Sequence, residues 1–300
     1  MNLRPVASKT LLFRPGPATG WLLDGDTLVM SAAMQHLGGT AEDPLARGSG
    51  ITALEHGALL HGSDTLSGVL LSPDSGPLEL AAATLYDRLL DLTEGWHLHR
   101  IWNFIPQINA EVDGLENYRA FNSGRLYTLQ KRWGTGIARR LPAASALGTR
   151  GGALALAFSA AREPATHFDN PLQESSIAYP REYGLSPPAF ARGSRLTTAT
   201  GDVWHLSGTA SIRGCRTIGE DIATQLSITM ENLAALCAEM AVPSHRRATW
   251  KVFLRHPEHL SQAVAAFSAA YPDDMASSLF LHADICRTDL LVEIEGHLSA

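Results

Sequence analysis

Residues 203–213 read Val-Trp-His-Leu-Ser-Gly-Thr-Ala-Ser-Ile-Arg, and they precede a long apolar-periodic stretch from about Glu220 to Met240. The first segment predicts a strand and the second a helix. Glu220 and Asp221 place negative charge at the positive end of that helix. After it we expect a strand over 249–254, a helix over 257–270 and strands near 278–285 and 290–295. Strands interleaved with two helices predict an α/β sandwich with the helices on one face of a sheet.

The preceding part of the chain predicts further strands and helices. Short apolar runs cut by Gly, Pro and Asp indicate strands and loops in the first ninety residues. These strands are expected at 10–13, 27–33 and 67–71. Ser75 to Pro77 should open a helix over 78–92, and further elements are a strand over 96–105, a helix over 114–133 and a strand over 153–159. The basic, small-residue passage 139–152 and the segment 162–201 lack periodicity, and a loop as long as the latter is usually functional or disordered.

Composition indicates a globular protein. The chain has 300 residues, 45% hydrophobic and 18% charged, with a formal net charge of -6, so nothing attracts it to nucleic acid or to an anionic membrane. Three scattered cysteines disfavour a disulfide framework or a structural zinc site. The N-terminal Met-Asn-Leu-Arg-Pro-Val has no apolar signal core, and no apolar run reaches 18 residues, which predicts a cytoplasmic protein.

Common catalytic and nucleotide motifs are absent from the sequence. There is no Walker loop, nucleophile elbow or His-Glu-x-x-His helix, and Gly134-Thr-Gly136 lacks the third glycine of a dinucleotide loop. His97 and His99 would share one strand face and could bind a metal, but no third ligand is evident nearby. We therefore favour two ordinary histidines and expect no metal.

Residues 101–125 crowd aromatics, asparagines and arginines into one short segment. Such side chains offer directed hydrogen bonds to a small anionic, oxygen-rich ligand. Tyr118 and Arg125 are seven residues apart and so share one face of the expected helix. The alternative is an ordinary solvated helix side.

The C-terminal tail contains a second pair of candidate residues, Cys286 and Glu293. Seven residues apart on an unbroken strand they would point to opposite faces, but a turn or bulge at 287–289 could return both to one cavity. By pattern alone, Glu293 and Glu295 share a face that is more often exposed to solvent. In a partly apolar pocket, a glutamate would instead have a raised pKa and could act as a general acid.

Several of these stretches together resemble the chorismatases, enzymes that cleave the enolpyruvyl ether of chorismate. The matching stretches are 102–109, 114–125, 170–180, 186–192, 206–212 and 286–293. The Ser-Gly-Thr-Ala strand before a long helix also resembles the Rid-type imine deaminase fold, which chorismatases share distantly with trimeric chorismate mutases. The resemblance implies a Rid-like catalytic half over 151–300, preceded by a related α/β half over 1–150 that carries part of the substrate pocket. It also implies a reaction without a cofactor, in a monomer or a homotrimer.

Roles for individual residues follow from the same resemblance. Tyr118, Arg125, Tyr179 and Arg192 occupy family positions suited to binding the two carboxylates of chorismate. Glu293 matches the family glutamate that protonates the methylene carbon of the enol ether.

The resemblance leaves the product open. Cys286 stands where the hydroxybenzoate-forming members carry a cysteine, although it could also be a small buried hydrophobe. Ala210 looks more like the choice of the hydrolytic members. The leading expectation is 3-hydroxybenzoate, with some 4-hydroxybenzoate, and pyruvate. The alternatives are hydrolysis to 3,4-dihydroxycyclohexa-1,5-dienoate and pyruvate, or a Rid-like binding or imine-hydrolysing protein.

Overall fold

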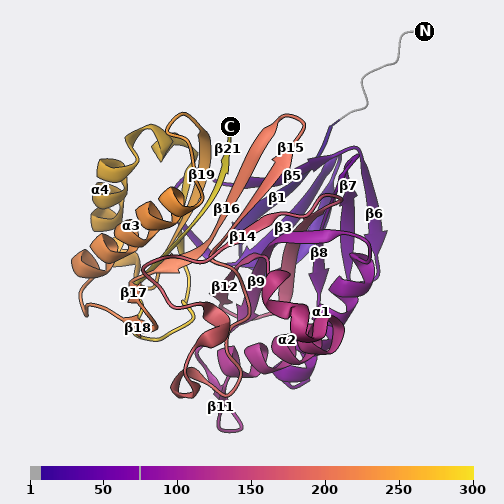
Figure 1. The fold of residues 1–300 in the computed structure, drawn as a ribbon, viewed down its shortest axis with the longest axis horizontal. Coiled ribbons are helices and arrows are strands. Elements are labelled where there is room, and N and C mark those ends of the chain that lie inside the picture. The colour runs from indigo at the N-terminus through magenta and orange to yellow at the C-terminus, as the bar shows by residue number, and fades with distance from the viewer. Residues whose placement is uncertain (1–7, 74–75) are drawn as a thin grey trace.

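Three sheets surround a shared interior in the computed structural model, which describes residues 8–73 and 76–300 (Figure 1). Two of the expectations above concern residues outside these ranges: the start of a helix at Ser75 and the N-terminal segment 1–6 without an apolar signal core. The smallest of the three sheets has the strand order β2-β3-β1-β5. Its strands are β1 (Lys9–Gly16), β2 (Gly20–Asp24), β3 (Thr27–Ala33) and β5 (Asp43–Gly48).

The first large sheet has the strand order β12-β9-β13-β8-β7-β6. Its strands are β6 (Gly50–Leu54), β7 (Gly57–His61), β8 (Thr65–Leu71), β9 (His97–Pro106), β12 (Ala143–Thr149) and β13 (Ala155–Ala161). Helices α1 (Leu78–Leu92) and α2 (Asn117–Trp133) bury their apolar stripes against one face of it. A short hairpin of β10 (Glu111–Val112) and β11 (Leu115–Glu116) precedes α2.

The second large sheet has the strand order β14-β15-β16-β21-β19-β20-β4. Its strands are β4 (Gln35–Gly39), β14 (Thr166–Phe168), β15 (Gly193–Thr198), β16 (Gly201–Ala210), β19 (Arg247–Leu254), β20 (Ser278–His282) and β21 (Val292–Ser299). Helices α3 (Ile222–Glu239) and α4 (Leu260–Ala270) cover one of its faces. The hairpin of β17 (Ile212–Arg213) and β18 (Arg216–Thr217) connects β16 to α3.

The two large sheets repeat one topology. In the first, the chain runs β8-α1-β9-α2-β12-β13, and in the second it runs β16-α3-β19-α4-β20-β21. The corresponding strands occupy corresponding places in each sheet, with β12 parallel to β9 and β20 parallel to β19. The expected α/β class, with helices on one sheet face and a related N-terminal half, is therefore confirmed. Because β13 belongs to the first sheet, the sheets divide the chain after residue 161; domains at 1–150 and 151–300 stay a prediction.

The interior lies on the sheet faces that the helices do not cover. Apolar side chains from all three sheets pack there, including Phe13, Phe104 and Phe253. Phe13 stacks on Phe104 with ring centroids 5.5 Å apart. The halves are thus joined by a core that belongs to neither alone.

The close approach of α1 and α2 depends on a glycine in the middle of α2. A Cβ atom on Gly124 would lie 2.0 Å from the carbonyl oxygen of Glu79 in α1. The low helix propensity of Gly124 is therefore the cost of a contact that no larger residue permits.

Three expectations about local structure were wrong. Strand β12 lies in the small-residue passage 139–152, where alanines and glycines hid it, and β14 and β15 lie within 162–201. The regular alternation that would place His97 and His99 on one face is interrupted in β9, because a bulge between Leu98 and Arg100 leaves His99 without a pairing partner on β13. In the described ranges, no helix is long and apolar enough to cross a membrane.

Candidate active site

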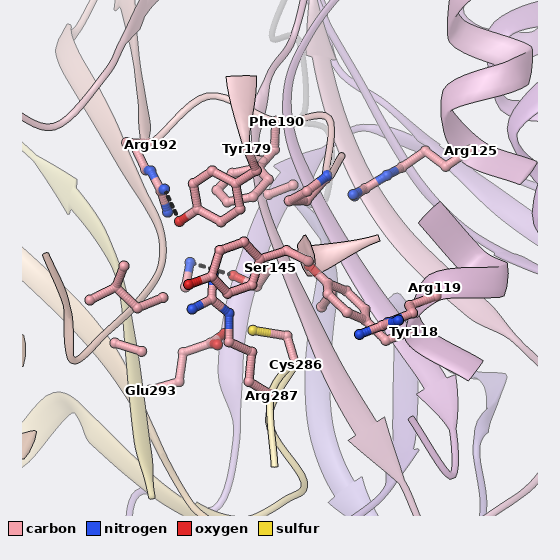
Figure 2. A pocket seen from close by; sticks show the side chains of 17 residues that line it. Tyr118, Arg119, Arg125, Ser145, Tyr179, Phe190, Arg192, Cys286, Arg287 and Glu293 are labelled. Atoms are coloured by element: carbon pink, nitrogen blue, oxygen red, sulfur yellow. Dashed lines mark hydrogen bonds between the residues drawn. The ribbon is translucent and has the colours of Figure 1, made fainter. Parts of the chain in front are cut away.

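A cavity lies between the two halves, with an empty volume of about 830 Å³ including the space at its mouth. Helix α2 and strand β12 supply one wall, while β16, β17, residues 286–287 and the start of β21 supply the other. The segment 179–192 also lines the cavity. All seven side chains singled out from the sequence line it: Tyr118, Arg125, Tyr179, Arg192, Ala210, Cys286 and Glu293 (Figure 2). The fold thus brings together residues separated by up to 175 positions, in a space of the size used for small molecules.

Glu293 lies at the start of β21, directly opposite Ala210 of β16. The pairing of these two strands slips between Leu206 and Thr209, and a Cβ atom on Gly208 would lie 1.9 Å from Glu293 Oε1. Glycine at position 208 is therefore what leaves room for the carboxyl group.

The Glu293 carboxyl group is buried and poorly hydrogen-bonded. The residue is 3% exposed, and its Oε1 atom has no hydrogen-bond partner. Burial, and next the charge of Glu295, raise the pKa of Glu293 to about 8. Such a carboxyl group is largely protonated at neutral pH and can donate a proton.

The structure excludes the solvent-facing alternative for Glu293 and Glu295. Glu295 is only 2% exposed. This face of β21 is covered by β9 and β12 of the other half rather than by water, as shown by the bonds that Glu295 accepts from Arg100 and Ser145. Strand periodicity separates the two faces of a strand but does not say what covers each of them.

Cys286 reaches the same cavity because the chain turns before β21. The amide of Leu290 donates to the carbonyl oxygen of Arg287 at 3.2 Å, so the turn expected at 287–289 is present. Figure 2 shows the Cys286 sulfur close to the Glu293 side chain. Burial, followed by the charge of Glu293, raises the pKa of Cys286 to about 12, so this residue is a neutral thiol.

Two buried arginines face the cavity without an acidic partner among the described residues. Arg125 is 1% exposed and donates to Asn122 Oδ1 at 2.7 Å. Arg192 is 4% exposed and donates to the hydroxyl of Tyr179 at 2.7 Å. The Nε atoms of both arginines lack partners. A buried guanidinium that lacks a counter-ion is costly, so both sites favour an anionic ligand.

The two arginines are at separate positions along the cavity. In Figure 2, Arg125 lies across the cavity from Glu293, whereas Arg192 lies on the same side as Glu293. Tyr118 of α2 lies on the same side of the cavity as Arg125 in this view, and burial, followed by the charge of Cys286, raises its pKa, so it stays a neutral hydroxyl. The cavity can therefore hold a molecule with two separated negative groups.

Sequence reasoning missed other residues that line the same cavity, among them Arg287 and Ser145. Arg287 lies 4.0 Å from the ring centre of Tyr183 and donates to the carbonyl oxygen of Cys215 at 2.8 Å, while its Nη2 atom is buried without a partner. Ser145 lines the cavity from β12, the strand that the sequence did not reveal. Arg287 follows Cys286 directly, so its place in that motif was available evidence for including it.

His97 and His99 do not come together as a metal site. The ring of His99 stacks on His205 at 5.0 Å, and His205 stacks on His297 at 4.8 Å. Burial, followed by the charge of His297, lowers the pKa of His99 to about 3, so its ring is neutral. Throughout residues 8–73 and 76–300, no group of three or more His, Cys, Asp or Glu side chains could hold a metal ion.

Comparisons with known proteins place the chain in a class and then in a family. A crystal structure of a chorismatase superposes with a TM-score of 0.84 at 28% sequence identity, covering 99% of this chain and 95% of that one. The chain therefore has the fold of an enzyme of two related α/β halves. Residues 47–160 match the family model "Chorismatase FkbO/Hyg5-like, N-terminal".

Curated relatives agree with that assignment. A chorismatase of Streptomyces rapamycinicus is 37% identical over 251 residues, which are 78% of this chain and 74% of that protein. A 3-hydroxybenzoate synthase of Streptomyces hygroscopicus is 32% identical over 247 residues, 75% of this chain and 71% of that protein. The chain belongs to the chorismatase family, so the resemblance stated above is confirmed, and the protein is an enzyme.

Proposed function

We propose that the protein cleaves the enolpyruvyl ether of chorismate and releases pyruvate, with Glu293 as the general acid. One observation carries the proposal. A buried carboxyl group, whose pKa burial raises to about 8 and whose Oε1 atom has no hydrogen-bond partner, shares a cavity with two buried arginines that lack acidic partners among the described residues. Chorismate is a dicarboxylate, so it supplies an anion for each arginine and an enol ether for the acid.

The geometry supports one orientation of the substrate. The methylene carbon of the enolpyruvyl group must reach Glu293, and the carboxylate of that group then lies on the side of Arg192 (Figure 2). The ring carboxylate lies toward Arg125 across the cavity. Tyr118 and Tyr179 provide further hydroxyl groups along this path. We therefore assign substrate binding to these four residues.

Proton transfer begins the reaction that we propose. The carbon–carbon double bond of the enol ether takes the proton of Glu293, which leaves an oxocarbenium-like centre beside the ether oxygen. The Glu293 carboxylate that remains stabilises this positive charge in surroundings of low polarity. The ether bond to the ring then breaks, its electron pair stays on the oxygen, and pyruvate leaves while the neighbouring ring hydroxyl attacks the ring carbon. A proton returns to the Glu293 carboxylate as the ring becomes aromatic. In the hydrolytic alternative, water adds to the oxocarbenium-like carbon instead, and the resulting hemiketal releases pyruvate and the dihydroxy acid. None of these proposed steps requires a cofactor.

The fate of the ring depends on what stands beside Glu293. We propose 3-hydroxybenzoate as the main product, with some 4-hydroxybenzoate, because Cys286 rather than a smaller inert residue lies next to the acid. The relative named 3-hydroxybenzoate synthase supports this choice. Ala210, opposite Glu293, favours hydrolysis to the dihydroxycyclohexadienoate, which is the second candidate.

Incubation of the purified protein with chorismate tests both candidates. We expect equimolar pyruvate, measured with lactate dehydrogenase, and an aromatic acid identified by chromatography. Replacement Cys286→Ala should raise the share of the dihydroxy acid, with Cys237→Ala, whose thiol is remote from the cavity, as the control. Absence of pyruvate would refute the proposed function, and an unchanged product ratio in the Cys286 variant would remove its directing role.

A further inference from the structure

Buried charges form a network behind the cavity, where the two halves meet the small sheet. Lys251 Nζ lies 2.5 Å from Asp43 Oδ2 and 2.7 Å from Glu295 Oε1. Arg100 Nη2 lies 2.6 Å from Glu295 Oε2, and Trp102 Nε1 donates to Glu295 Oε1 at 3.0 Å. All four charged residues are at most 4% exposed. Glu295 is the centre of this network, since it alone contacts both cations.

The network reaches the cavity through a serine. Ser145 Oγ donates to Glu295 Oε2 and accepts hydrogen bonds from Arg100 Nη2 at 2.6 Å and from the amide of Gly208 at 2.9 Å. Gly208 is the residue whose missing side chain leaves room for Glu293. The backbone beside the acid is therefore held by the same hydroxyl group that holds Glu295.

Glu293 and Glu295 are neighbours on one face of β21. Residues two apart on a strand point the same way, about 7 Å apart along the chain. A negative charge at that separation, with both side chains at most 3% exposed, acts strongly on a second carboxyl group.

We propose that Glu295 is a positioning residue: its fixed negative charge, held in place by Lys251 and Arg100, keeps the Glu293 carboxyl group protonated and ready to donate. The inference deepens the proposed function, on which it rests for the role of Glu293 as the acid. Two buried carboxyl groups can instead share a single proton between them. Glu295 does not take part in such sharing, because it accepts hydrogen bonds from four donors of its own.

The charges around Glu293 agree with this assignment. After burial itself, Glu295 is the largest influence that raises the pKa of Glu293, and the nearby cations act against it. These cations are Arg100, Arg192 and Arg255. Cys286 and Tyr118, which also face the acid, are neutral. Although burial opposes ionisation of Glu295, the charges of Lys251 and Arg100 and the bonds it accepts lower its pKa.

Direct titration of the two carboxyl groups tests the proposal without any substrate. The protein is labelled with [δ-13C]glutamate, and the Glu293 and Glu295 resonances are assigned by their loss in Glu293→Gln and Glu295→Gln. In the unmodified protein, Glu293 should titrate near pH 8, while the midpoint of Glu295 should lie below the usual pKa of a glutamate. In Glu295→Gln, the Glu293 midpoint should fall by about one to two pH units.

Two further variants separate charge from architecture. Glu295→Asp keeps the negative charge, so the Glu293 midpoint in this variant should lie close to that of the unmodified protein. Asp43→Asn removes the other carboxylate on Lys251, which lies farther along the network, and should leave the Glu293 midpoint within about 0.3 pH units. If the network only joins the halves, both Glu295→Gln and Asp43→Asn would lower the melting temperature without moving the midpoint.

An unchanged midpoint in folded Glu295→Gln would overturn the proposal. If that variant does not fold, the titration of the unmodified protein still tests the proposal. A Glu295 that is protonated at pH 7, or a Glu293 that titrates near pH 4.5, would overturn the proposal. The falling limb of kcat/KM for pyruvate release should shift with the Glu293 midpoint. The carboxyl groups could titrate as expected although the protein releases no pyruvate from chorismate. That result would refute the proposed function but would leave the electrostatic role of Glu295 supported.

Discussion

Replacing the acid should abolish pyruvate release and at the same time make the protein more stable. Glu293 is 3% exposed, and its pKa is raised from 4.5 to about 8 in the folded protein. Between these two values, the native state binds a proton that the unfolded state has lost, so the free energy of unfolding falls as the pH rises. The cost is absent below pH 4.5 and complete above pH 8. Glu293→Gln removes it, because an amide does not ionise.

The magnitude follows from the two pKa values. The ionisation cost is about 2 kcal/mol at pH 6, about 3 kcal/mol at pH 7 and about 5 kcal/mol at pH 9. Gln differs from Glu in packing and hydrogen bonding by an amount that does not depend on pH, so the change with pH isolates the carboxyl group. Urea unfolding of both proteins at pH 6 and pH 9 should show the advantage of the variant growing by about 2 to 3 kcal/mol. A difference that stays constant across this range would refute the reasoning that Glu293 is a buried, protonated acid.

Three other substitutions test the space beside Glu293, the packing of α1 on α2, and the binding of a substrate carboxylate by Arg125. Gly208→Ala should displace the Glu293 carboxyl group and lower kcat at least about 100-fold with little loss of stability; normal turnover would contradict the close contact seen at Oε1. Gly124→Ala should force α1 and α2 apart and lower the free energy of unfolding by about 1 to 3 kcal/mol in urea, whereas an unchanged midpoint would mean that the helices can shift freely. Arg125→Lys should raise the KM for chorismate about 10- to 100-fold with a smaller effect on kcat, and an unchanged KM would exclude Arg125 as a carboxylate clamp.

Helical and strand periodicity predicted much of each half. The helix over 78–92 agrees with α1, and the strand-helix order from residue 203 onward agrees with β16, α3, β19, α4, β20 and β21. These elements have clear apolar stripes because each has one buried face and one face of different polarity. Strand β12 gave no such pattern. Its Ala144, Ser145 and Ala146 are small because they border a cavity, where larger side chains would fill the space.

The duplicated topology was not readable as a sequence repeat. The two halves share strand order and connections, but equivalent positions meet different surroundings. At the end of the first sheet, Ala155 pairs with Leu71 of β8, whereas Glu293 pairs with Ala210 at the equivalent place in the second. Side chains that line a pocket in one half and a packed interior in the other diverge, although the backbone path is kept.

The sequence by itself predicted a set of residues that the fold gathers around one cavity. Motifs from 102 to 293 carried the family resemblance, and each candidate drawn from them lines one cavity. Only the tertiary structure decided what those residues can do. The pKa of Glu293 depends on its burial and on Glu295, and the burial of Glu295 depends on Arg100 and Ser145 of the other half. The protonation state of an acid depends on the dielectric around it and on charges within a few ångströms. The residue pattern of β21 carries no information about either, and by itself it suggested two solvated glutamates.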